Sequence, residues 1–156
     1  MKKKNGFTVV ELIASFALTM IISVFLFEVL IEVKDVYVET AIKTNIQEKT
    51  ALISKNIKAI MPEIGGTVTC QSNSCNIDGK FLTITHINNI KEPDYVTIND
   101  QRFYMPKDGD NYVKISDIKL SATEGVSDGY LKVHFKLTSD NLSKDYNYTA
   151  VYYYTR

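Results

Sequence analysis

A long apolar segment near the N-terminus limits what this chain can fold into more than any other feature. It runs from Phe7 to Ile31 and follows a short leader that contains three consecutive lysines, Lys2 to Lys4. As a helix, the stretch 7–33 would be about 40 Å long at about 1.5 Å per residue, and a bilayer core needs only about 30 Å. The lysines favour a cytoplasmic N-terminus, so the rest of the chain is expected outside the membrane.

One carboxylate, Glu11, lies near the start of the apolar segment. At the centre of a membrane helix such a group costs about 2.5–3.5 kcal/mol on insertion scales, so it is normally paired or functional. A cut between Gly6 and Phe7 would create a partner, because it would leave a new amine on Phe7. Glu28 and Glu32 are interpreted instead as the point where the helix leaves the lipid, with no special chemistry.

The leader through Gly6, followed by Phe7-Thr8-Val9-Val10-Glu11-Leu12-Ile13, resembles the class III leader of type IV pilins and type II secretion pseudopilins. The resemblance implies that a prepilin peptidase cuts after Gly6 and that the new N-terminal Phe7 is methylated. It also implies that Glu11 neutralises an N-terminal amine during assembly. An uncleaved signal anchor with an incidental glutamate is the alternative interpretation of this segment.

The same resemblance implies a non-enzymatic structural subunit, a minor pilin that primes or joins a type IV pilus (fimbrium). The alternatives are a pseudopilin of a type II protein secretion or DNA-uptake apparatus, or a fibre-borne adhesin or DNA receptor. Its partners would be other pilin or pseudopilin subunits, the prepilin peptidase, and an inner-membrane platform protein with its cytoplasmic assembly ATPase. The protein would lie first in the cell membrane, as a single-pass protein with its head outside, and later in an extracellular fibre.

The helix is expected to continue past the membrane. No glycine or proline occurs between Phe7 and Met61, and Pro62 with the Gly65-Gly66 pair then ends the helical pattern. Major pilins commonly carry such a helix breaker in the membrane segment, so its absence favours a minor subunit. Beyond the membrane, apolar residues recur at spacings of three, four or seven: Val38, Ile42, Ile46, Ile53, Ile57 and Ile60. The pattern predicts a leader at 1–6, a membrane helix at 7–33 and its soluble continuation at 34–61, with a coiled coil as the alternative for the last part.

After Pro62 the apolar period becomes twofold, which predicts β-strands in a head covering 62–156. The alternating segments are 67–70, 75–77, 81–85, 95–98, 102–105, 113–115, 118–120, 131–137 and 146–154. A slip at Ser116-Asp117 predicts a β-bulge or a strand break. Residues 106–111 are predicted as a loop, and Asp128-Gly129 as a turn. Together these segments predict an α+β fold in which an antiparallel sheet packs on the soluble half of the helix.

Cys70 and Cys75 bracket a polar, turn-like segment of four residues. Outside the cytoplasm, a pair at this spacing fits a disulfide that closes a hairpin, provided the Cα atoms come within about 4.4–6.8 Å. Free thiols or a redox pair are the alternatives. No second cysteine pair or histidine cluster in the sequence completes a metal site.

No catalytic residue, metal site or cofactor is expected in the head. His86 and His134 are the only histidines and are far apart in the sequence, and there is no phosphate-binding loop or serine elbow. Asp108, Asp110 and Asn111 could supply part of a Ca²⁺ shell, but a solvated turn is the preferred interpretation.

Charge and aromatic patterning give little support to nucleic-acid binding. Removal of 1–6 would delete three of the 18 basic residues and leave all 18 acidic ones, so the mature chain would be slightly acidic. The tyrosines at 146, 148, 152 and 154 fall on one face of the last strand. They are interpreted as core and sheet surface rather than as a base-stacking platform. A nucleic-acid partner therefore stays an unsupported alternative.

Overall fold

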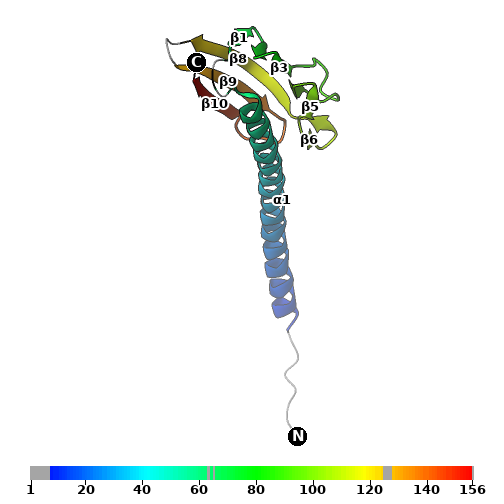
Figure 1. The fold of residues 1–156 in the computed structure, drawn as a ribbon. Coiled ribbons are helices and arrows are strands. Elements are labelled where there is room, and N and C mark those ends of the chain that lie inside the picture. The colour runs from blue at the N-terminus through cyan, green and yellow to red at the C-terminus, as the bar shows by residue number, and fades with distance from the viewer. Residues whose placement is uncertain (1–7, 63, 65, 125–127, 156) are drawn as a thin grey trace. The chain divides into compact units, whose positions relative to one another are not determined.

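The computed structural model describes residues 8–62, 64, 66–124 and 128–155. The leader, Gly6 and Phe7 lie outside these residues, so the cleavage and methylation predicted there stay predictions. The chain divides into two compact units, Met1–Val38 and Glu39–Arg156, and each is described by itself. The second unit includes the last part of the helix as well as all the strands. Figure 1 colours these elements by their position in the chain.

A single helix, α1, runs from Val9 to Ile60, close to the expected limits of 7 and 61. Its side chains are exposed from Val9 to Tyr37, and this part is long and apolar enough to cross a membrane, a property it shares with signal sequences. The prediction of one long apolar N-terminal helix is therefore confirmed. No break interrupts α1, as expected from the absence of glycine and proline.

The part of α1 that belongs to the head buries one stripe of side chains. Its buried members are Ile42, Ile46, Thr50, Ile53, Ile57 and Ile60, which confirms the predicted stripe except that Val38 is only half-buried. The burial of Thr50 is not predicted by the apolar pattern, because its side chain is polar. Its hydroxyl donates to the carbonyl of Ile46 at 2.9 Å and to that of Gln47 at 3.1 Å, so it is buried without an unsatisfied group.

Five short strands form an antiparallel meander. They are β1 (Val68–Gln71), β2 (Ser74–Ile77), β3 (Lys80–Thr85), β4 (Tyr95–Ile98) and β5 (Gln101–Tyr104), paired in that order. β4 and β5 form a hairpin with a two-residue turn. Both residues of its turn, Asn99 and Asp100, have positive φ (46° and 67°), as two-residue hairpins of the favoured twist require.

Three longer strands form a second antiparallel sheet, in the order β10-β9-β8 (Figure 1). They are β8 (Lys114–Glu124), β9 (Asp128–Thr138) and β10 (Tyr146–Thr155). The predicted bulge is confirmed, because the pairing of β8 with β9 shifts between Ser116 and Lys119. The alternation predicted for β9 and β10 is borne out by a buried set that comprises Leu131, Val133, Phe135, Leu137, Tyr148, Tyr152 and Tyr154. Tyr146, on the same face of β10, is only half-buried.

Three details of the predicted head are wrong. The strands form two sheets and a small hairpin rather than one sheet, and the predicted 106–111 loop contains that hairpin, β6 (Lys107–Asp108) with β7 (Asn111–Tyr112). Asp128 and Gly129 are not a turn but the first residues of β9, paired with Thr155 and Tyr154. Gly129 is needed for close packing, since a Cβ there would lie 2.4 Å from Cζ of the Tyr154 ring.

Candidate functional site

The first turn of α1 is fixed by a reciprocal pair of hydrogen bonds between Thr8 and Glu11. The Thr8 backbone N–H and hydroxyl donate to Oε2 of Glu11 at 2.8 and 2.9 Å, and the Glu11 N–H donates back to the Thr8 hydroxyl at 3.3 Å. This is a capping box, in which two otherwise unpaired N–H groups at a helix start are satisfied. The Thr-x-x-Glu spacing is its sequence signature, and sequence reasoning that looked only for a charge partner of Glu11 missed it.

Capping leaves part of the Glu11 carboxylate open. Both Thr8 bonds end on Oε2, and Oε1 accepts no hydrogen bond from the residues that the structure describes. The predicted partner, the amine of Phe7, lies outside those residues, and that pairing stays a prediction. Glu11 therefore has a local role at the helix start that is compatible with a second interaction through Oε1.

The hydroxyl groups farther along the apolar segment are satisfied within the helix. Ser15, Thr19 and Ser23 each donate to the carbonyl four residues earlier, at 2.8 Å in every case. In lipid, a polar group without such a partner would be costly. Glu11 thus remains the one charged residue of the sequence between Thr8 and Phe27.

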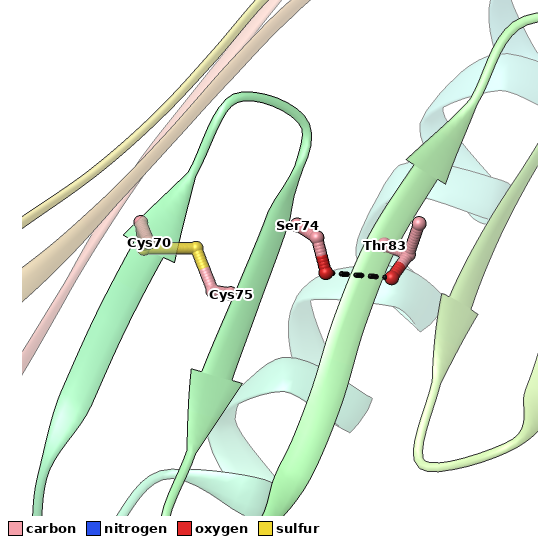
Figure 2. Close-up of a disulfide and its surroundings, with 4 residues drawn as sticks. All are labelled: Cys70, Ser74, Cys75 and Thr83. Atoms are coloured by element: carbon pink, nitrogen blue, oxygen red, sulfur yellow. Dashed lines mark hydrogen bonds between the residues drawn. A yellow bond between two sulfur atoms is a disulfide. The ribbon is translucent and has the colours of Figure 1, made fainter.

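The cysteine pair forms the predicted disulfide. Cys70 and Cys75 lie directly opposite each other on β1 and β2, with their Cα atoms 4.0 Å apart, and the bond joins the two strands beside their turn (Figure 2). This Cα separation is slightly shorter than the expected range of about 4.4–6.8 Å. The described part of the chain contains no free cysteine, so the free-thiol alternative does not apply, and the redox-pair alternative stays open.

A buried carboxylate, Asp94, holds the two sheets together. It accepts hydrogen bonds from His86 Nδ1 (2.8 Å), the Ile87 N–H (2.8 Å), Lys114 Nζ (2.6 Å) and the Ile115 N–H (2.6 Å). Burial by itself raises the pKa of Asp94, but the hydrogen bonds, led by the one from Lys114, outweigh it and hold that pKa below its usual range. Sequence reasoning gave Asp94 no role and left His86 isolated.

Lys114 extends this network into the loop between β3 and β4. Besides the Asp94 contact, its ammonium group donates to the backbone carbonyls of Asn89 (3.0 Å) and Glu92 (2.9 Å). A single lysine on β8 therefore fixes a loop of the other sheet. All three donors of the Lys114 ammonium group are thus used within the protein.

Asp108 is buried rather than solvated, so the predicted solvated turn is wrong at this position. It accepts hydrogen bonds from the Ser139 hydroxyl, from the Asn141 N–H (3.2 Å) and from Asn141 Nδ2 (2.5 Å). These bonds attach the β6–β7 hairpin to the segment after β9. Asn111 contributes a further bond to Asp140 at 3.0 Å. In the part of the chain that the structure describes, no group of three or more His, Cys, Asp or Glu residues could hold a metal ion.

His134 lies on the outer side of β9, where its Nδ1 is 2.7 Å from the Thr149 hydroxyl and its Nε2 is 3.6 Å from Asp117. Asp117 also pairs with Lys119 at 2.8 Å, and this hydrogen bond lowers the pKa of its carboxyl group. These groups sit around the bulge of β8. They stabilise an irregular strand.

No family model, curated protein or solved structure matches this chain. A long N-terminal apolar helix followed by antiparallel sheets is consistent with a pilin-like fold. The residues that resemble that family are those of the leader and of the first turn of α1.

Proposed function

We propose that the protein is a minor pilin-like subunit of a type IV pilus. A prepilin peptidase cuts after Gly6, and the subunit then enters the fibre through its N-terminal helix. One observation carries the proposal. The first charged residue of the long apolar helix, Glu11, lies in its first turn, four residues after Phe7, which would be the new N-terminus. That position is where a carboxylate can reach a terminal amine of its own helix or of a neighbouring one.

The chemistry of assembly follows from that arrangement. Cutting after Gly6 frees an amine on Phe7, next to the residue that caps the helix. Thr8 already occupies Oε2 of Glu11, and Oε1 is available to the amine. In a low-dielectric environment the pair fixes register between helices more than it adds stability, because desolvation offsets most of the Coulomb attraction. Withdrawing the helix from lipid requires external energy, which an assembly ATPase acting through a platform protein would supply.

The unbroken course of α1 from Val9 to Ile60 supports a minor rather than a bulk subunit. It suits a pseudopilin of a secretion or DNA-uptake apparatus equally well, and that is the second candidate. Both functions use the same leader, the same first turn and the same membrane topology. Neither involves enzymatic activity of the head.

Mass spectrometry of the protein isolated from cell membranes tests the proposal. The mature chain should start at Phe7 and carry one N-methyl group, and Gly6→Ala should leave the leader attached. A Cys70→Ser/Cys75→Ser variant is the matched control and should be cut normally, because the cut depends only on sequence at the cytoplasmic face. A mature start beyond residue 30 would mean a conventional signal peptide and would refute the family assignment.

Assembly separates the two candidates. Cells that make a retractable surface pilus should carry the subunit in sheared fibres, whereas a pseudopilin should stay with the cell envelope at native expression levels. Blots of sheared and cell-bound fractions against the same antibody measure this directly.

A further inference from the structure

The first three strands of the meander present an outer face whose side chains stand in two rows. Cys75, Ile77 and Leu82 are buried on the opposite, inner face of the same strands. Strand pairing places the outward residues directly beside one another: Thr69, Asn76 and Phe81 in one row, and Gln71, Ser74 and Thr83 in the next. The proposed function makes no use of this face.

A hollow of about 260 Å³ lies on this face, lined by Thr69, Gln71, Ser74, Asn76 and Phe81. None of the lining side chains carries a charge. Four of them end in a hydroxyl or an amide, and the fifth, Phe81, is an aromatic ring that is 53% exposed. The hollow therefore combines one exposed aromatic face with uncharged hydrogen-bonding groups.

We propose that this hollow is a binding site for a neutral sugar ring. A charged ligand would meet no opposite charge in the lining, and an apolar ligand would cover the polar groups of Thr69 and Gln71 without giving them partners. Hydroxyl and amide groups offer donors and acceptors together, as do the hydroxyls of a sugar. The ring of Phe81 provides a flat apolar surface for the C–H face of a pyranose. The volume is smaller than the roughly 300–1,000 Å³ of pockets for drug-sized ligands, and it suits a single ring.

The site is held in its shape before any ligand arrives. The disulfide between Cys70 and Cys75 fixes the register of β1 against β2, and thereby which outward side chains stand together (Figure 2). The hydroxyl groups of Ser74 and Thr83 are hydrogen-bonded at 2.9 Å, which Figure 2 also shows. Asn76 accepts a hydrogen bond from the Gly79 N–H at 2.9 Å through Oδ1, which orients its amide. Such preorganisation lowers the entropy lost on binding.

A shallow, neutral site of this kind binds one sugar weakly. Where a fibre of the kind proposed above carries more than one copy of this subunit, multivalency would raise the effective affinity on a glycan-covered surface. The single site does not depend on that display. Its test is therefore carried out on the isolated subunit, independently of processing and assembly.

The test applies the full chain, purified in a detergent without a sugar headgroup, to an array of neutral and sialylated oligosaccharides. The best neutral ligand is then titrated by calorimetry. Neutral glycans should bind, and Phe81→Ala should weaken binding at least about tenfold, as removal of an aromatic anchor typically does. Tyr153→Ala is the matched control, because Tyr153 is an aromatic residue of the other sheet that is 78% exposed; its affinity should equal that of the wild type.

Two further variants separate the site from general effects on folding. Thr69→Val removes one hydroxyl of the lining at nearly constant volume and should weaken binding, with an unchanged near-ultraviolet circular dichroism spectrum. Cys70→Ser/Cys75→Ser should weaken binding because the register is no longer locked. Absence of binding to every array member, stronger binding of sialylated than of neutral glycans, or equal affinity of wild type, Phe81→Ala and Thr69→Val would each overturn the proposal.

Discussion

Replacing Lys114 by methionine tests how strongly the Asp94 network stabilises the head. The substitution removes the ammonium group that lies 2.6 Å from Asp94 Oδ1 and keeps most of the aliphatic stem, which is largely buried. Asp94 is completely buried, so the change leaves a buried charge without its main partner. Breaking a buried pair from one side costs about 3–5 kcal/mol. The three remaining donors, His86, Ile87 and Ile115, should bring the loss toward the lower end, about 3 kcal/mol.

The matched control is Lys119→Met. Lys119 also pairs with an aspartate at 2.8 Å, but both side chains are well exposed, at 69% and 48%. Exposed pairs contribute about 0–1 kcal/mol. Urea unfolding of the full chain, followed by near-ultraviolet circular dichroism of its ten tyrosines, measures both variants in the same way. Equal losses for the two lysines would refute the argument that burial makes the Asp94 pair important.

The pH dependence gives an independent check. The folded-state pKa of Asp94 is lowered, so its contribution is fully present above the unfolded-state pKa, near 3.9. The contribution is lost as the pH falls through the folded-state value. The difference in unfolding free energy between wild type and Lys114→Met should therefore be constant from about pH 5 to 7 and shrink below about pH 4. A difference that stays constant down to pH 2 would mean that Lys114 acts through packing alone.

Three more outcomes are expected. Glu11→Ala should give a protein that is cleaved and inserted in the membrane but absent from sheared fibres. Glu28→Ala, at the more hydrated end of the membrane helix, should assemble. Equal amounts of the two variants on blots of sheared fibres would contradict this. Non-reducing digestion should recover the peptides of Cys70 and Cys75 linked, and replacing both by serine should cost less than the roughly 3 kcal/mol of a 15-residue loop, measured by urea unfolding. Gly129→Ala should destabilise the head by about 1–3 kcal/mol, because its methyl group would lie within 2.4 Å of a buried tyrosine ring; an unchanged unfolding midpoint would show that the ring moves freely.

Features set by local periodicity could be predicted from the sequence. The 3.6-residue repeat predicted α1 and its buried isoleucines, and the twofold repeat predicted β9 and its four buried side chains. Even the bulge at Ser116 could be found, because it changes the phase of the alternation. The disulfide followed from close spacing in a hairpin. Each of these signals lies within a few residues of the structure that it specifies.

Features that depend on distant partners could not be predicted in this way. Asp94 is buried because its donors come from residues 86–87 and 114–115, and nothing near it in the sequence indicates that they converge. Asp108 is buried for the same reason, with partners more than 30 residues away. Glycine permits both tight turns and close packing, so the sequence around Gly129 does not distinguish a turn from a strand. The capping box is different, since its Thr-x-x-Glu signature lies within four residues of the sequence and predicts it directly.

The hydroxyl groups along the apolar part of α1 have a consequence for how two such helices could recognise each other. Since Ser15, Thr19 and Ser23 donate their protons to their own backbone, they offer a neighbour only acceptor oxygens. Two identical surfaces of this kind contain no complementary donors, so sliding one along the other by a turn breaks no hydrogen bond between them. The register between two such helices would then be set by the groups in the first turn. The rest of the apolar face would allow one helix to slide along the other until that register is reached.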